Sequence, residues 1–404
     1  MTPRSSLAHG RSYLAIPGPS VMPERVLAAM HRSAPNIYEG DLVDLTARVV
    51  ADLRRVALST GHVAIYICNG HGTWEASVAN LFSRGDKVLS LQTGRFGVGW
   101  AVQAQAMGVT VEALDFGLSA PVDPNRVEAA LRADPRHEIK AVLLTHVDTA
   151  TSIRNDVAAV RAAMDAAGHP ALLAVDCIAS LACDAFRFDD WGVDVMLAAS
   201  QKGLMVPPGL GFVWVSDKAV AAGQSADLRT PYWNWGPRLA PEFYYQHFGG
   251  TAPTHHLFGM AESLTMILEE EGLPHVWARH RALARAVGAA FEAWGQGGAI
   301  ALNVADPAFR AGSVTAARIA QGGAERLRRW CEAEAGVTLG IGLGMAPPGT
   351  PEADDFLRVA HMGHVNAHMT LGVLAVMEAG LQALSIPHGT GGIQAAAAVV
   401  AAGA

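Results

Sequence analysis

The sequence predicts an α/β fold with a mainly parallel seven-stranded β-sheet, followed by a smaller C-terminal α/β domain. Between about residues 60 and 216, short apolar runs alternate with stretches of helical character. The runs are apolar throughout, which is typical of strands that helices cover on both faces. The predicted strands are residues 63–68, 87–91, 110–116, 139–145, 171–176, 194–198 and 211–215.

Helices are predicted between these strands and on either side of them. A Gly-containing turn precedes a helix from Thr73, and Asp123 is the expected N-cap of a helix that begins with a proline. A long helix is expected from about Gly259. The other predicted helices are residues 23–32, 41–58, 97–107, 124–132 and 156–167.

Three parts of the chain are distinguished by pattern. Residues 1–20 are expected to form an N-terminal arm, residues 21–274 a large domain and residues 275–404 a small one. Within the large domain, residues 220–258 are irregular and rich in aromatics, including Trp233 and Trp235. No basic groove accompanies these aromatics, so they are interpreted as a dimer interface and not as a platform for stacked bases.

Composition narrows the class of protein. Half of the 404 residues are hydrophobic and 17% are charged, which supports a large core and argues against disorder. The net charge is -7 with no Lys/Arg-rich stretch, so neither nucleic acid nor a membrane is an expected partner. No signal core or membrane-spanning run is apparent. The four cysteines fit neither a metal motif nor a disulfide framework, which favours a reduced, cytoplasmic protein without a metal site: Cys68, Cys177, Cys183 and Cys331.

Polar clusters follow four of the predicted strands. In open α/β sheets, ligands bind beyond the carboxyl ends of the strands. Residues 69–73, Asn-Gly-His-Gly-Thr, open a helix with backbone amides suited to an anion, although such a turn is a weak signal alone. Residues 145–151 supply hydroxyls, and Asp176 and residues 200–202 end two further strands. The predicted ligand site lies where these clusters meet.

Lys202 and Asp176 point to a particular cofactor. A lysine that forms a Schiff base and an aspartate that holds a pyridinium nitrogen are the groups that pyridoxal phosphate (PLP) chemistry needs. Lys202 could be an ordinary surface lysine and Asp176 a helix N-cap. The flanking sequence Ser-Gln-Lys-Gly-Leu, followed by Pro-Pro-Gly, favours the catalytic interpretation.

The chain resembles the class V, fold-type I PLP-dependent aminotransferases. Within them it is similar to the branch that contains serine–, alanine– and aspartate–glyoxylate aminotransferases and pyridoxamine–pyruvate aminotransferase. The resemblance covers nearly the whole chain. The segment 200–209 is highly specific, and the other matching segments are residues 16–19, 189–194 and 357–363.

The resemblance implies a role for each matching residue. Lys202 would attach PLP and then shuttle the substrate proton, while Asp176 would keep the pyridine nitrogen protonated. Arg358 would clamp the substrate carboxylate in a bidentate pair, and Asn36 lies near the expected substrate entrance. Thr251 would reach the phosphate from the neighbouring subunit, which implies a homodimer with shared sites. The other implied cofactor contacts are Asn69, Gly70, His71, Phe96, Thr149, Ile178 and Gln201.

The sequence departs from the family pattern near the expected donor site. Phe248 replaces a frequent tyrosine and has no hydroxyl to offer a phosphate. Residues 36–39 and 254–256 also differ, so the identity of the amino donor stays open. His255 and His256 look like half a metal site but lack partner ligands, which favours polar contacts over coordination. His146 is expected either to contact the cofactor or to satisfy a neighbouring carbonyl.

The expected function is a ping-pong PLP-dependent transamination from a small amino acid to glyoxylate or pyruvate. Two rivals keep PLP chemistry: a PLP-dependent lyase, and a pyridoxamine–pyruvate aminotransferase in which the vitamer is the substrate. Phe248 fits the vitamer enzyme, whereas the glycine loop at Gly70 argues against it. A catalytically silent scaffold is a third alternative, against which the intact Lys202 and Asp176 argue.

Overall fold

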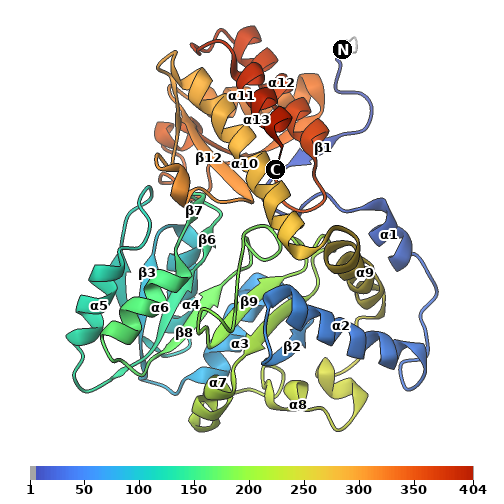
Figure 1. The fold of residues 1–404 in the computed structure, drawn as a ribbon, viewed down its shortest axis with the longest axis vertical. Coiled ribbons are helices and arrows are strands. Elements are labelled where there is room, and N and C mark those ends of the chain that lie inside the picture. Colours follow the sequence, from blue (N-terminus) through green and yellow to red (C-terminus); the bar gives the residue numbers. More distant parts are fainter. Residues whose placement is uncertain (1–5, 404) are drawn as a thin grey trace.

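A computed structural model describes residues 6–403 and contains the predicted seven-stranded sheet. The strand order is β2-β10-β9-β8-β5-β3-β4. Strand β10 is antiparallel to both of its neighbours, and the other pairs are parallel. This confirms the mainly parallel sheet (Figure 1). The bounds are β2 His62–Tyr66, β3 Lys87–Gln92, β4 Thr110–Asp115, β5 Ile139–Thr145, β8 Leu172–Asp176, β9 Val195–Ala199 and β10 Gly211–Val215.

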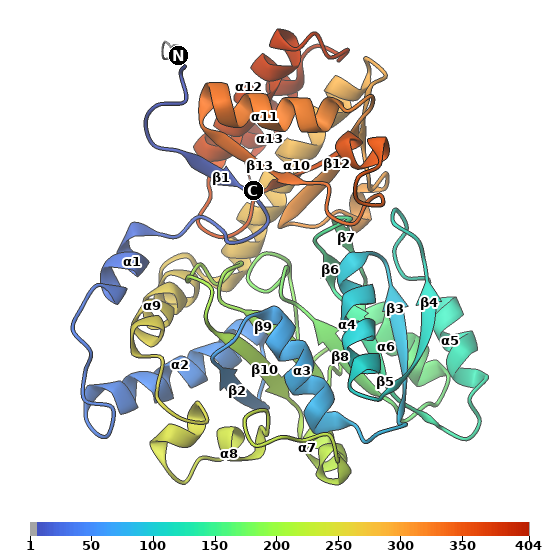
Figure 2. The same cartoon turned by 180° about the vertical axis from the view of Figure 1, so that it is seen from behind.

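Helices cover both faces of this sheet because successive strand side chains point to opposite faces and both sets are apolar. In β5, Val142 and Leu144 belong to one hydrophobic core, while Ala141 and Leu143 belong to another. The first core is closed by α2 Asp41–Ala57, α5 Pro124–Arg132, α6 Val157–Ala166 and α9 Thr254–Thr265. The second is closed by α3 Gly70–Leu81 and α4 Arg95–Ala106, which lie in front in Figure 2.

Local capping explains where several helices begin. The Asp123 side chain accepts a hydrogen bond from the Asn125 backbone and caps α5 as predicted. The helix expected from Thr73 begins three residues earlier, because Asn69 caps it at Gly70. The remaining helices of the large domain are α1 Glu24–Met30, α7 Asp217–Ala222 and α8 Gly236–Leu239.

The long helix expected from about Gly259 begins earlier, at Thr254, and is divided. The chain forms α9, then a π-helical turn over Met266–Glu271, and then the separate helix α10 Leu273–Gly295. Gly272 lies between them with φ +82°, a left-handed conformation that interrupts a helix and that glycine adopts at low cost.

The smaller sheet has the order β1-β13-β14-β12-β11, with β1 parallel to β13 and the other pairs antiparallel. Strand β1, Tyr13–Ala15, comes from the predicted N-terminal arm, whose residues 1–5 lie outside the described residues. The division at residues 274 and 275 stays a prediction. The other elements are β11 Ile300–Leu302, β12 Val314–Ile319, β13 Val337–Ile341, β14 Phe356–Ala360, α11 Gly323–Ala335, α12 Ala367–Ala383 and α13 Gly392–Ala402.

The aromatic segment 220–258 is divided between core and surface. Trp235 is only 4% exposed and packs in the core beneath α3, so the interface position predicted for it is wrong. Phe243 and Tyr245 are 60% and 56% exposed. These two rings, stacked with centroids 6.1 Å apart, remain available at the surface.

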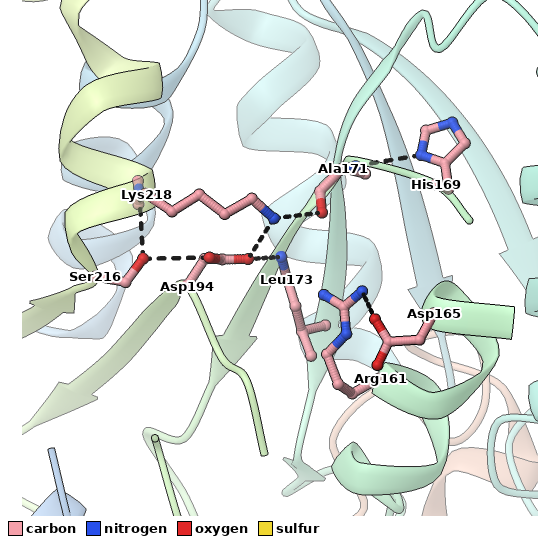
Figure 3. A network of polar contacts seen from close by, with 9 residues as sticks. Arg161, Asp165, His169, Ala171, Leu173, Asp194, Ser216 and Lys218 are labelled. Carbon is pink, nitrogen blue, oxygen red and sulfur yellow. Dashed lines mark hydrogen bonds and ion pairs between the residues drawn. The ribbon is translucent and has the colours of Figure 1, made fainter. Parts of the chain in front are cut away.

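A polar network fixes the amino-terminal edge of the large sheet (Figure 3). The buried Asp194 carboxylate accepts hydrogen bonds from the Leu173 backbone at 2.9 Å and from the Ser216 hydroxyl at 3.2 Å. Lys218 Nζ lies 3.5 Å from the same carboxylate and donates to the Ala171 carbonyl at 3.4 Å. These bonds tie the starts of β8 and β9 to the end of β10, which leaves the carboxyl-terminal edge for chemistry.

Residues 6–403 were compared with the expectations on membrane spans, metal sites and disulfides. None of their helices is both long and apolar enough to cross a membrane. They contain no group of three or more His, Cys, Asp or Glu side chains arranged to hold a metal ion. All four cysteines are free thiols.

Candidate active site

A cavity of about 210 Å³ lies at the carboxyl ends of the large-sheet strands. Nine of the ten predicted cofactor-contacting residues line it, Thr251 being the exception. Polar clusters from different strand ends are therefore brought together as the sequence predicted. The lining residues are Asn69, Gly70, His71, Trp74, Phe96, Val147, Thr149, Asp176, Ile178, Ala179, Gln201 and Lys202.

Asp176 is the last residue of β8 and is 3% exposed. Its carboxylate accepts hydrogen bonds from Trp74 Nε1 at 3.0 Å and from the Ile178 backbone at 2.8 Å. Burial raises the pKa of Asp176 to about 7 against the effect of these bonds, and the nearby Asp148 raises it further. The carboxyl is thus oriented by two donors and can hold a proton near neutral pH.

Trp74 is a site residue that the sequence reasoning missed. It lies on α3 four residues after Gly70, a spacing that places both on the same side of the helix. Its ring makes edge contacts with His71 and Phe96, with centroids 4.7 and 6.4 Å away. That spacing from the predicted glycine loop is the signal that could have identified it.

Lys202 lies in the loop between β9 and β10, which Ser200 holds in shape. The Ser200 hydroxyl donates to the Pro207 carbonyl at 2.8 Å and accepts from the Leu210 backbone at 3.2 Å. Burial lowers the pKa of Lys202 to about 8, helped by the positive charge of Arg358 and opposed by Asp176. The amine therefore loses its proton far more readily than an ordinary lysine.

The N-terminal segment covers the lysine. Lys202 Nζ donates to the Pro17 carbonyl. Gly18 has φ +109°, and a Cβ there would lie 2.3 Å from Lys202 Nζ. Ser20 fixes this segment, because its backbone donates to the Gln201 carbonyl at 2.9 Å and its hydroxyl to the Lys202 carbonyl at 2.8 Å. The Pro-Gly-Pro sequence thus forms the close cover of the amine.

Asp148 positions one wall of the cavity. Its buried carboxylate accepts hydrogen bonds from the backbone of Phe96 at 2.8 Å, Gly97 at 3.2 Å and Ala150 at 2.9 Å. Burial raises the pKa of Asp148. It belongs to a small hairpin of β6 Val147–Asp148 and β7 Ile153–Arg154 and so fixes the start of α4, which directs Phe96 to the cavity.

Arg358 lies on β14, is 6% exposed, and approaches the cavity without lining it. It donates to the carbonyl of Thr149, a lining residue, at 3.0 Å and to that of Ile341 at 2.7 Å. Burial lowers its pKa to about 10. This places a fixed positive charge at the cavity edge, and its role in binding a substrate carboxylate stays a prediction.

Thr251 and Asn36 are not brought to this cavity. Thr251 is exposed and lines a separate cleft of about 420 Å³ together with Ile37 and Tyr38. Asn36 is exposed, and its side chain accepts from the Tyr38 backbone at 2.9 Å. The roles implied for Thr251 and Asn36 stay predictions, because both lie away from the site formed by their own chain.

Phe248 and three histidines are engaged in packing or hydrogen bonds away from the cavity. Phe248 is fully buried against Tyr244, so in this chain it does not face the cavity as the comparison with a phosphate-binding tyrosine implied. The His146 ring bonds to the Ser180 hydroxyl at 2.9 Å instead of lining the cavity, and burial lowers its pKa to about 3. His255 and His256 donate to the carbonyls of Arg32 and Pro208 at 3.0 and 3.3 Å, which agrees with polar contacts instead of coordination.

The cavity residues fit PLP. Gln201 Oε1 is buried without a hydrogen-bond partner among residues 6–403 and belongs to the lining. At Gly70 a Cβ would lie 2.5 Å from Ile178 Cδ1, so the Ile178 side chain occupies the space that a side chain at position 70 would need. The Lys202 amine could form a Schiff base with the PLP aldehyde, and the Asp176 carboxyl could pair with the PLP ring nitrogen.

The fold and this site define a PLP-type transferase, and comparison with known proteins gives the family. Residues 65–352 match the family model "Aminotransferase class-V". The chain therefore belongs to the class V aminotransferases and is a transaminase, which confirms the expected family and fold-type I class.

Similar proteins span almost the whole chain. A serine–glyoxylate aminotransferase of Methylorubrum extorquens is 36% identical over 92% of this chain and 91% of its own length. An L-aspartate–glyoxylate aminotransferase of Paracoccus denitrificans is 34% identical over 95% and 94%. The crystal structure of pyridoxamine-pyruvate aminotransferase from Mesorhizobium loti superposes with a TM-score of 0.86 at 25% identity, covering 98% of this chain and 99% of that one.

Proposed function

We propose that this transaminase uses PLP to move an amino group from a small amino acid to glyoxylate or pyruvate. The observation that carries the proposal is the placement of Lys202, Asp176 and Arg358 around one cavity. The names of the glyoxylate-dependent relatives support glyoxylate as the acceptor, and the pyridoxamine–pyruvate enzyme supports pyruvate.

Each residue has a definite task in this reaction. Asn69, Gly70 and His71 would hold the phosphate, and Lys202 would hold PLP covalently. When bound, PLP supplies a ring that accepts the electrons left at the substrate Cα after its proton departs. Asp176, held by Trp74, would keep a proton at the ring nitrogen. Once the donor's amine has displaced it from the cofactor, the free Lys202 amine, with its lowered pKa, would take the proton from the substrate Cα and return it to C4′ of the cofactor.

Water exclusion supports the same assignment. Lys202 is half-buried, and Pro17 and Gly18 lie directly over its amine. An amine covered in this way is shielded from bulk water, which would otherwise compete with it for the substrate proton. Arg358 would orient the substrate carboxylate through paired hydrogen bonds, which fixes the Cα near the amine.

The test is the visible absorbance of the purified protein with a panel of amino donors. We expect a yellow protein that bleaches with one donor and recovers its colour with glyoxylate or pyruvate. Lys202→Ala should abolish turnover, and turnover in that variant would contradict the lysine assignment. Bleaching without recovery by any 2-oxo acid, with release of other products, would favour the lyase alternative.

A second candidate is a pyridoxamine–pyruvate aminotransferase, because that enzyme's structure superposes closely on this chain. The buried position of Phe248 removes one argument for it, since the ring lies in the core instead of on the cavity. A colourless protein that PLP does not reconstitute, but that converts pyridoxamine with pyruvate, would establish this alternative over the first.

We also propose a homodimer with shared sites. Thr251 lines a surface cleft with Tyr38 and Tyr245, and Tyr38 is 84% exposed. An exposed aromatic cluster of this kind is typical of a protein interface. Light scattering should give twice the mass of one chain, and a monomeric active enzyme would exclude shared sites. Cytoplasmic residence is proposed as well, and cell fractionation would test it.

A further inference from the structure

A second cavity, of about 360 Å³, lies apart from the catalytic one, and no residue lines both. It is formed by α10, by residues 183–185 of the large domain, and by residues 307–312 between β11 and β12. Helix α10 runs from the large domain into the small one (Figure 1). Four arginines line it: Arg154, Arg281, Arg285 and Arg310.

Two of these arginines are neutralised within the chain. Arg310 pairs with Glu292 at 2.6 Å. Arg154 donates to the Ala308 carbonyl at 2.5 Å and lies 3.9 Å from Asp184 Oδ1. With four positive charges and the two carboxylates of Glu292 and Asp184, the cleft keeps two positive charges.

The uncompensated charges belong to Arg281 and Arg285. Both are exposed on α10, four residues apart, so they lie on the same side of the helix. Among residues 6–403, neither forms an ion pair within 4.0 Å, and Arg285 makes one hydrogen bond, to the Gly403 carbonyl at 3.3 Å. Like charges at this spacing destabilise a helix, so an anion that bridges them would relieve the repulsion.

The carboxylate of the cleft does not neutralise them. Asp184 is 8% exposed and accepts from the Gly312 backbone with both oxygens, at 2.9 and 3.0 Å. Burial raises the pKa of Asp184 to about 6, and the charges of Arg154 and Arg281 lower it. The Asp184 carboxylate already accepts hydrogen bonds from Gly312 and lies near Arg154. The N–H groups of the Arg281 guanidinium therefore stay free to bind a ligand.

The remaining wall is apolar. Trp277 is 7% exposed and lies on α10 one turn before Arg281, and Ala284 and Pro307 also line the cleft. The volume exceeds what a single inorganic anion needs. The site therefore combines guanidinium groups for anionic oxygens with an apolar surface for a carbon skeleton.

We propose that this cleft binds a small organic dianion, held through its oxygens by Arg281 and Arg285 and through its carbon skeleton by Trp277. Phosphate monoesters and dicarboxylates share this chemistry, because a guanidinium pairs with the oxygens of either. The proposal is independent of the reaction at Lys202.

Calorimetric titration of the PLP-loaded full-length enzyme tests the proposal, with glycerol 3-phosphate, malonate and inorganic phosphate as probes at constant ionic strength. We expect glycerol 3-phosphate, malonate or both to bind, and the double variant Arg281→Gln/Arg285→Gln to weaken that binding at least about tenfold, since each charge-assisted hydrogen bond can account for that much. Arg48→Gln is the matched control, because Arg48 is an exposed helical arginine without a hydrogen bond or ion pair among the described residues. It should leave affinity unchanged.

A further control separates this cleft from the catalytic cavity, which also attracts anions. Arg358→Gln should leave affinity unchanged, and a loss in that variant but not in the double variant would overturn the proposal. Failure of both organic probes to bind the unmodified enzyme would overturn it as well. Binding of inorganic phosphate as tightly as its glycerol ester would overturn the part assigned to Trp277. A double variant that keeps its thermal midpoint shows that the loss comes from binding and not from unfolding.

Discussion

Replacing Trp74 by phenylalanine removes the hydrogen bond to Asp176 while keeping an aromatic ring in place. The bond is 3.0 Å long and ends on a buried carboxylate whose pKa is about 7. A hydrogen bond to a charged group is worth about 1.5–3 kcal/mol. Since one pKa unit corresponds to about 1.4 kcal/mol, the change should raise the pKa of Asp176 by about 1–2 units.

The sign of the stability effect follows from proton linkage. The pKa of Asp176 is raised on folding, so the folded state binds more protons than the unfolded state between about pH 4 and pH 7, and stability falls as pH rises through that window. Because Trp74→Phe raises the folded-state pKa of Asp176 further, the pH range over which stability falls extends to higher pH. The variant should therefore lose about 1–2 kcal/mol more of its unfolding free energy at about pH 9 than at about pH 5.

Urea unfolding of the cofactor-stripped protein at the two pH values measures this difference. Trp100→Phe is the matched control, because Trp100 is 1% exposed on the adjacent helix α4 and its Nε1 is buried without a partner. Trp100→Phe should lower the free energy of unfolding by the same amount at both pH values. Equal costs for Trp74→Phe at both values would refute the view that its indole stabilises an ionised Asp176.

Three further predictions concern the reaction. The kcat/KM for the oxo acid, which reports the enzyme form in which the Lys202 amine is free, should rise with pH up to about 8 and then level off as Lys202 loses its proton, and a profile that is flat through this range would contradict Lys202 as the base. Arg358→Lys should raise the KM for the oxo acid about 10–100-fold with PLP absorbance retained, because lysine cannot form the bidentate pair, and an unchanged KM would remove Arg358 from the clamp. Gly70→Ala should weaken PLP binding in a spectroscopic titration, since its Cβ would meet Ile178 Cδ1 at 2.5 Å, whereas Gly372→Ala, which meets nothing within 4 Å, should not.

The large sheet and the position of Lys202 at the cavity could be predicted because their signals are local. Each central strand is a short run that is apolar on both faces, and that property is visible in any single stretch of sequence. Strands β5 and β10 begin and end at the predicted residues. The loop at Lys202 is likewise identified by its own neighbours, because Ser200 and Pro207 are the residues that shape it.

The parts that were missed depend on residues far apart in the chain. The bond from Trp74 to Asp176 joins positions 102 apart, and that from Phe96 to Asp148 joins positions 52 apart. No local pattern shows which carboxylate will meet which donor. Thr251 was named from the resemblance, and its own chain places it in a separate cleft, so its predicted role depends on a contact that a single chain does not contain.

The pairing of β1 with β13 has a consequence for how the enzyme is made. Tyr13 lies opposite Val337, a separation of 324 residues (337 minus 13). At roughly 5–20 residues per second, a ribosome needs roughly 15–65 s to synthesise that interval. Strand β1, which leads into the segment over Lys202, therefore cannot pair until β13 has been synthesised, so its anchoring is completed late although it is made early. A fusion partner or deletion near Tyr13 should accordingly affect the yield of active enzyme more than its secondary structure.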